Sequence, residues 1–114
     1  MTSEDRSRVE LLQGTLDLIV LKLLQAGPAN GWDLTRSIQT TSNGAFSVNY
    51  GTLYPALHRL ESRGWISAKW GLTDNKRRAR FYALTAAGRR QLAAEEKAWD
   101  QFTAALGLIL KPAT

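Results

Sequence analysis

The chain has 114 residues, 44% of them hydrophobic and 22% charged, which fits one globular domain and excludes wholesale disorder and an integral membrane protein. It has no cysteine, which excludes disulfides, thiolate zinc sites and thiol nucleophiles. Its single histidine, His58, cannot supply the several ligands of a histidine-based metal site, and a Ser-His-Asp arrangement would have to use that one imidazole. The net charge of +5 is uneven, because residues 50–90 hold nine basic and two acidic residues and the rest of the chain is slightly acidic. This balance suits a polyanionic partner, although a solvated basic loop would have the same composition.

Residues 1–10 are polar and mixed in charge, which predicts a loosely attached arm and no signal peptide, and hence a cytoplasmic protein. Residues 11–25 are nearly all apolar, as expected of a helix surrounded by protein, so we predict the central core helix here. Thr15, with Asp17 in the following turn, could start this helix, but an earlier start fits equally well.

A short second helix is predicted after a break in the chain. The Gly-Pro pair at residues 27–28 ends the first helix, and Asn30 or Gly31 opens the second. This helix covers residues 32–41, because residues 40–44 are turn formers that end it.

A third helix is predicted to end near Arg63, since Gly64 suits the position after a helix C-terminus. Its start has two interpretations, because Asn49 is a good N-cap whereas Pro55 fits only a first turn. Either the helix proper begins near Thr52, or its opening turn is irregular.

A helical wheel divides the third helix into two faces. Leu53, Leu57 and Leu60 share an inward face, and the outward face is polar and weakly basic, with Thr52, Pro55, His58, Arg59 and Ser62. Such a face suits an approach to DNA bases and phosphates, although an ordinary amphipathic surface helix would show the same period. His58 is expected to face solvent or DNA, because no second catalytic or ligating residue type accompanies it.

A basic hairpin follows. Residues 65–70 alternate between apolar and polar side chains, which predicts a strand, and residues 79–84 predict its partner. The turn between them, residues 71–78, carries Lys76, Arg77 and Arg78. We expect these side chains on the DNA backbone or in the minor groove, with a solubilising loop as the alternative.

A final helix is predicted over residues 86–110, followed by a frayed tail. Two series of residues seven apart form a heptad seam that only Glu95 interrupts: Leu92, Trp99 and Leu106, and Glu95, Phe102 and Ile109. A monomer would leave Trp99 and Phe102 facing water, so we expect a homodimer built by this helix.

Trp99 has two interpretations. It could be plain packing within the seam, or it could face its symmetry mate across a gap and hold a flat apolar ligand by stacking. In the second case Asp100, the next residue, would attract a cationic group.

The order of helix, helix, helix, hairpin and helix predicts a mainly α protein with a small β-hairpin, in the winged helix-turn-helix plan with an added C-terminal helix. We assign residues 1–85 to a winged helix-turn-helix DNA-binding domain and residues 86–114 to a C-terminal dimerisation helix and tail. A symmetric dimer would place two DNA-reading units about one helical turn apart, which implies a palindromic operator.

Several runs of the sequence resemble the signature of the PadR family of transcriptional regulators. They are residues 51–61 (GTLYPALHRLE), 64–66 (GWI), 80–85 (RFYALT), 88–90 (GRR) and 14–18 (GTLDL) with Leu21. The resemblance covers about residues 10–106. It implies a dimeric winged-helix repressor, of a kind often released from DNA by small phenolic or drug-like molecules.

The short final helix resembles that of the compact subfamily that includes the lactococcal multidrug-binding regulator, in which a tryptophan from each subunit sandwiches planar drugs. Trp99, followed by Asp100, is at the matching place, while the predicted lining residues Leu18 and Phe102 are particular to this chain. The resemblance also implies that a set of residues approaches DNA together with residues 76–78: Asn49, Tyr50, Thr52 and Tyr54. Tyr54 could instead belong to the core, and the wing tip, residues 72–75, lacks the glycines common in the family.

Together these patterns predict a homodimeric DNA-binding repressor, released by a planar hydrophobic molecule bound at the dimer interface. The expected partners are double-stranded DNA, a second copy of the chain and planar aromatic or cationic small molecules; no cofactor, metal, membrane contact or enzyme activity is expected. Two alternatives stay open, namely a DNA-binding dimer without an effector and a winged-helix module that binds another protein.

Overall fold

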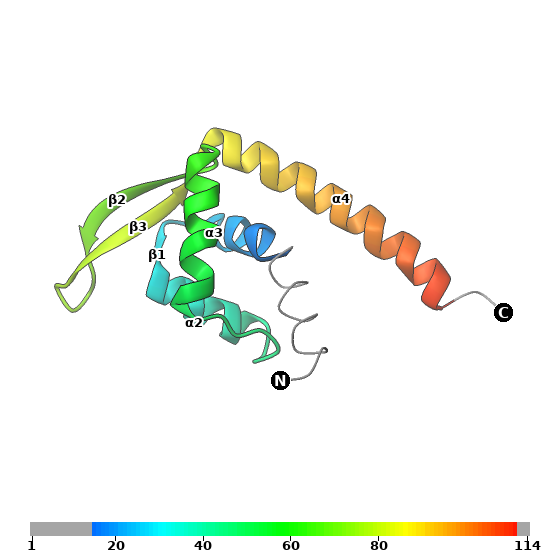
Figure 1. Ribbon diagram of the computed structural model, residues 1–114, viewed down its shortest axis with the longest axis horizontal. Helices are drawn as coiled ribbons and strands as arrows, with labels where there is room; N and C mark the ends of the chain where they lie inside the picture. The colour runs from blue at the N-terminus through cyan, green and yellow to red at the C-terminus, as the bar shows by residue number, and fades with distance from the viewer. Residues whose placement is uncertain (1–14, 112–114) are drawn as a thin grey trace.

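Three helices lead into a hairpin and a long final helix (Figure 1). The computed structural model describes residues 15–111, so the predicted arm, the first residues of the predicted core helix and the last three residues of the tail lie outside the described residues. The first helix covers residues 15–24 of this range. It is followed by β1 (Ala29–Asn30), α2 (Gly31–Thr41), α3 (Tyr50–Ser62), β2 (Ile66–Leu72), β3 (Arg78–Leu84) and α4 (Ala86–Leu110). The mainly α fold class with a small antiparallel β element is therefore confirmed.

The first helix is central to the core, as its apolar sequence predicts. Its side chains Leu16, Val20, Leu21 and Leu24 are at most 2% exposed. The inward stripe of α3 is confirmed as well, and the buried residues from the other elements that join the first helix are Leu34, Ile38, Leu53, Ala56, Leu57, Leu60, Ile66, Tyr82, Leu84 and Leu92. Because each fully buried leucine stabilises the fold by about 1.5–3 kcal/mol, this cluster fixes α3 firmly against the first helix.

The sheet has three antiparallel strands in the order β1-β3-β2. β1 pairs Ala29 with Tyr82 and Asn30 with Phe81. No sequence pattern predicts β1, because two residues are too few for an alternation to show. Asn30 also caps α2, since its side-chain oxygen accepts a hydrogen bond from the backbone N–H of Asp33 at 2.8 Å.

The hairpin is longer than the sequence predicts. β2 continues to Leu72 and β3 begins at Arg78, so the predicted turn of residues 71–78 shrinks to residues 73–77. Gly71 belongs to the ladder, where a Cβ atom would lie 2.9 Å from the Phe81 ring, so only glycine fits there without displacing the ring. Gly71 and the basic residues after it interrupt the alternation of apolar and polar side chains, so the sequence pattern does not predict the outer part of the strands.

α3 begins at Tyr50, earlier than one of the two predicted starts. Asn49 is its N-cap, and the Asn49 side chain accepts a hydrogen bond from the backbone N–H of Thr52 at 3.0 Å. Pro55 therefore lies inside the helix, where it lacks the N–H that the carbonyl of Gly51 would accept. Gly51 is exposed at the helix surface, so water can satisfy that carbonyl.

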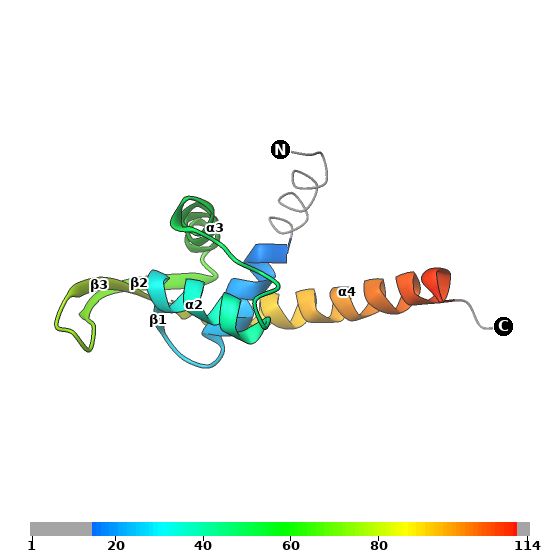
Figure 2. The same cartoon turned by 90° about the horizontal axis from the view of Figure 1, so that it is seen from below.

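α4 leaves the rest of the molecule along most of its length, as both views show (Figures 1 and 2). It starts where Thr85 accepts a hydrogen bond from the backbone N–H of Gly88 at 3.0 Å. The buried residues of α4 are Gly88 and Leu92, whereas residues 97–110 are exposed throughout. Leu92 is part of the core, so the prediction that the heptad seam begins with Leu92 is wrong, and an uncovered apolar face begins at Trp99.

Candidate nucleic-acid interface and apolar pocket

The first turns of α3 present two aromatic side chains. Tyr50 and Tyr54 are one helical turn apart, and their ring centroids are 5.5 Å apart. They are 42% and 46% exposed, so the alternative that Tyr54 belongs to the core is wrong. Gly31 lets Tyr50 lie close to α2, since a Cβ at residue 31 would meet the Tyr50 ring at 2.9 Å.

The Tyr50 phenol is suited to donate a hydrogen bond. Partial burial, and to a smaller extent the nearby Tyr54 and Asp33, raise the pKa of Tyr50 above its ordinary value. A tyrosine phenol is protonated at neutral pH in any case, so Tyr50 can donate to a phosphate oxygen. His58, one turn beyond Tyr54, is exposed on the same side of α3, and Thr52 is half-buried on the opposite flank.

Arg59, predicted to face DNA, lies on the first helix instead of pointing freely into solvent. Its Nη2 donates to Oδ1 of Asp17 at 2.9 Å, and Nη1 of Arg63 is 3.8 Å from Oδ2 of the same carboxylate. The Asp17 side chain is only 18% exposed, so one half-buried carboxylate holds two guanidinium groups beside α3. The predicted contact of Arg59 with DNA stays a prediction, and the contact with Asp17 was missed by sequence reasoning.

The wing, which we define as residues 69–80, extends away from the helices (Figure 1). Its tip is closed by a hydrogen bond in which the backbone N–H of Thr73 donates to the carbonyl of Arg77 at 2.9 Å, and Lys76 adopts a φ of 61°. Lys76, Arg77 and Arg78 are exposed, and none of them forms an ion pair with an acidic residue of the described range 15–111. Their charges are therefore available to a polyanion.

An apolar pocket of about 360 Å³ lies between the first helix, the end of α2 with its following loop, and α4. Leu18, Trp99 and Asp100, three of the four predicted ligand residues, line this pocket. Phe102 does not line it but stacks on Trp99 with a centroid distance of 5.7 Å. Sequence reasoning missed Ile38 and Phe46, which reach the pocket from segments without any pattern that links them to α4.

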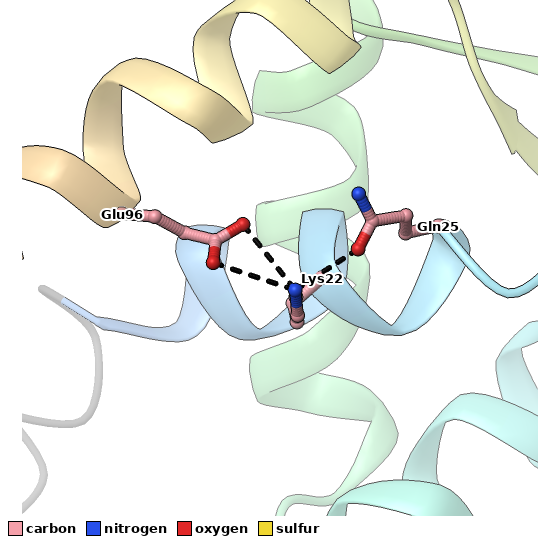
Figure 3. Close-up of polar contacts among 3 residues, drawn as sticks. All are labelled: Lys22, Gln25 and Glu96. Carbon is pink, nitrogen blue, oxygen red and sulfur yellow. Dashed lines mark hydrogen bonds and ion pairs between the residues drawn. The ribbon is translucent and has the colours of Figure 1, made fainter.

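One rim of the pocket is charged. Lys22 of the first helix lies between Glu96 of α4 and Gln25 (Figure 3), with its Nζ 3.4 Å from both Glu96 carboxylate oxygens and 3.0 Å from Oε1 of Gln25. Both partners of the ion pair are about half exposed, so it contributes little to stability. It does link the first helix to α4 beside the pocket.

The sequence matches the family model described as "Transcriptional regulator PadR-like family" over residues 20–94. The chain belongs to this family. The chain is similar to the crystal structure of a PadR family transcriptional regulator from Eggerthella lenta. The two are 30% identical with a TM-score of 0.78, and the match covers 96% of this chain and 93% of that one. A transcriptional regulator from Clostridium thermocellum is 25% identical with a TM-score of 0.81, covering 90% of this chain and 99% of that one. The "Negative transcriptional regulator PadR" of Bacillus subtilis is 27% identical over 77 residues, which are 68% of this chain and 42% of that protein.

Membership of the PadR-like family makes this chain a DNA-binding transcriptional regulator with a winged-helix fold, and not an enzyme. The alternative of a winged-helix module that binds protein and no DNA is thereby set aside. Within residues 15–111, none of the helices combines the length and the apolar character that a membrane span requires.

Proposed function

We propose that this PadR-like regulator is a homodimeric repressor that acts in the cytoplasm on a palindromic operator and is released by a planar aromatic or cationic small molecule. Residues 1–85 would bind DNA, and residues 86–114 would form the dimer. The observation that carries this proposal is the exposed apolar face of α4, which continues from the apolar pocket at Trp99. Repression is supported by the similarity to the Bacillus subtilis relative, a negative transcriptional regulator.

The exposed apolar side chains of α4 support the proposed dimer. Trp99 is 44% exposed, Phe102 57% and Leu106 39%, so each leaves a large apolar area open to solvent. Full burial of a large apolar side chain stabilises an association by about 1.5–3 kcal/mol, so pairing of this face of α4 with its copy would be strongly favoured. A two-fold dimer presents two α3 helices about 34 Å apart, which matches a palindromic operator.

DNA contact is assigned to two surfaces. On α3, the contacting residues would be Asn49, Tyr50, Thr52, Tyr54, His58 and Arg59, with α3 in the major groove. On the wing, Lys76, Arg77 and Arg78 would contact phosphates or the minor groove. Asp17 would fix the direction of the Arg59 guanidinium before DNA arrives.

The effector site is assigned to the pocket. Its volume is at the lower end of the range for small-molecule sites, and Leu18 and Trp99, with Phe102 behind the indole, supply apolar walls. Asp100 would attract the charge of a cationic ligand. A ligand that fits only one spacing of the two α3 helices lowers the fraction of dimers able to bind the operator.

A DNA titration tests the regulatory part of the proposal. The segment upstream of the protein's own gene is compared with a scrambled duplex of the same composition at two salt concentrations. We expect a preference for the native segment that persists at the higher salt. Equal, weak binding that disappears with salt would contradict sequence-specific regulation.

Trp99→Ala tests the effector site, with the planar cationic dye ethidium as the probe and sedimentation as the readout of the dimer. We expect Trp99→Ala to lose dye binding while the dimer persists. Trp32→Ala, which removes a 59% exposed indole outside the pocket, is the matched control and should bind the dye normally. A Trp99→Ala variant that is monomeric would show plain packing and contradict the pocket.

A further inference from the structure

One face of the outer half of the hairpin carries exposed apolar side chains, which phosphate binding by the wing's basic residues does not explain. In the β2–β3 register Ile66 pairs with Leu84, Ala68 with Tyr82, Trp70 with Arg80 and Leu72 with Arg78. Side chains two residues apart on a strand point to the same face, so these four pairs share one face of the hairpin. Near its base this face joins the core through Ile66, Tyr82 and Leu84. Toward the tip the same face leaves the core.

Two large apolar side chains are exposed on this outer part. Trp70 is 63% exposed and Leu72 is 65% exposed, so within residues 15–111 no element covers them. The two neighbouring arginines each make a specific contact. The Arg78 guanidinium lies 4.9 Å from the centroid of the Trp70 ring, and Nη2 of Arg80 is 3.1 Å from Oε2 of Glu61 on α3. The Glu61 contact shows that the face carrying Trp70 is turned to the side of the sheet on which α3 lies.

The charge around this face selects its partner. The wing holds five basic residues, Lys69, Lys76, Arg77, Arg78 and Arg80, against a single acidic one, Asp74. An apolar protein partner would leave these positive charges without negative partners at the interface. Nucleic acid supplies phosphates for the charges as well as apolar sugar surface for Trp70 and Leu72, so it is the partner that fits this face. α3, the DNA-reading helix of the winged-helix fold, lies on the same side, so one duplex can meet both.

We propose that Trp70, Leu72 and Arg78 form a minor-groove contact next to the site read by α3. The Arg78 guanidinium enters the groove, while Trp70 and Leu72 pack against the sugars at its edge. A narrow groove over A·T pairs concentrates negative potential and attracts arginine, and apolar side chains commonly accompany such an arginine. This inference rests on DNA binding by the chain and adds Trp70 and Leu72 to its contact surface.

Trp70 also positions the arginine. A guanidinium stacked on an indole keeps its N–H groups at its edges, where they can donate to the minor-groove acceptors of A·T pairs. The stack also limits the rotamers that an exposed arginine would otherwise sample, so less freedom is lost on binding. The expected consequence is a preference for A·T-rich flanks outside the bases contacted by α3.

The test uses the full chain and duplexes that the wild-type protein enriches from a random-sequence pool. Each enriched site is remade with A·T and with G·C flanks, and affinity and hydroxyl-radical protection of the flanks are measured. We expect Trp70→Ala and Arg78→Ala each to weaken binding to the A·T-flanked site about tenfold and to abolish flank protection. Arg78→Lys should keep the salt dependence but lose the flank preference, because the charge remains and the planar stack does not.

Lys69→Ala is the matched control, because Lys69 is on the same strand but points to the opposite face and its loss removes one wing charge. It should keep flank protection and preference. Trp70→Phe retains an aromatic face and should keep most of the preference, so it decides the question if Trp70→Ala fails to fold. Flank protection and preference that survive in both Trp70→Ala and Arg78→Ala would overturn the inference and leave the stack a stabiliser of the hairpin. A wild-type chain that enriches no duplex would contradict the proposed sequence-specific function instead.

Discussion

Gly88 is the residue that lets α4 start against the hairpin. A Cβ atom at this position would lie 1.9 Å from the carbonyl oxygen of Trp65, which itself accepts a hydrogen bond from the backbone N–H of Thr85 at 3.1 Å. Neither the backbone of Trp65 nor the start of α4 can give way without breaking that contact. The direction in which α4 leaves the molecule therefore depends on one missing methyl group.

Gly88→Ala should lower the free energy of unfolding by about 1–3 kcal/mol, because the added methyl overlaps a fixed backbone atom. Urea denaturation followed by circular dichroism measures the change. Gly107→Ala is the control in the same helix, since a Cβ there meets no atom within 4 Å, and it should not lower stability. Equal effects of the two substitutions would contradict the steric argument.

Asp17 neutralises two guanidinium groups beside α3, those of Arg59 and Arg63. Asp17→Asn should release them, so non-specific DNA binding should tighten and the slope of log K against log salt should steepen by up to about 2, because each added phosphate contact contributes about 0.9. Titration of a random-sequence duplex at several salt concentrations measures both effects.

Glu96→Gln is the control for Asp17→Asn. It changes the net charge equally and frees Lys22, which lies at the pocket rim away from α3. The control should steepen the slope less. The assignment fails if Asp17→Asn and Glu96→Gln give the same salt dependence, since the effect would then come from net charge alone.

Among the elements, long helices with a regular apolar period were predictable and irregular short segments were not. The first helix and the inward leucines of α3 follow directly from the sequence because burial imposes their period. The full length of the hairpin was not predicted, because Gly71 and Arg78 are not residue types typical of strands. Both nevertheless belong to the ladder through cross-strand pairing. The start of α3 was ambiguous because the Asn49 cap and Pro55 give opposing local signals, and packing of the leucine stripe favours the longer helix.

The Asn49 cap can be tested at the level of α3. Asn49→Ala should lower the free energy of unfolding by about 1 kcal/mol, since the backbone N–H of Thr52 loses its side-chain acceptor. Asn49→Asp retains that acceptor and should keep the stability, yet it places a negative charge at the DNA surface and should weaken operator binding. Thermal unfolding and a DNA titration separate the two effects; full DNA affinity in Asn49→Asp would remove Asn49 from the proposed interface.

For the whole molecule, the heptad pattern predicted the apolar face of α4 but not which of its residues the chain covers itself. Leu92 belongs to the series by spacing, yet it is 1% exposed because the base of α4 packs on the core. Spacing alone cannot separate a residue buried within one chain from one buried between two chains. Of the predicted ligand residues, Leu18, Trp99 and Asp100 line one pocket and Phe102 does not, while Phe46 reaches the pocket only through the tertiary fold. Their role in binding a ligand stays a prediction.

This division of α4 predicts opposite outcomes for two substitutions. Leu106→Asp should convert the proposed dimer into a folded monomer, because Leu106 is 39% exposed and lies outside the core cluster. The monomer should lose operator affinity, since it reads one half-site. Leu92→Ala should instead destabilise the fold by about 2–5 kcal/mol, as for other buried leucines. Sedimentation and thermal unfolding of both variants distinguish these results, and a Leu106→Asp chain that is still dimeric would show that subunits associate through another surface.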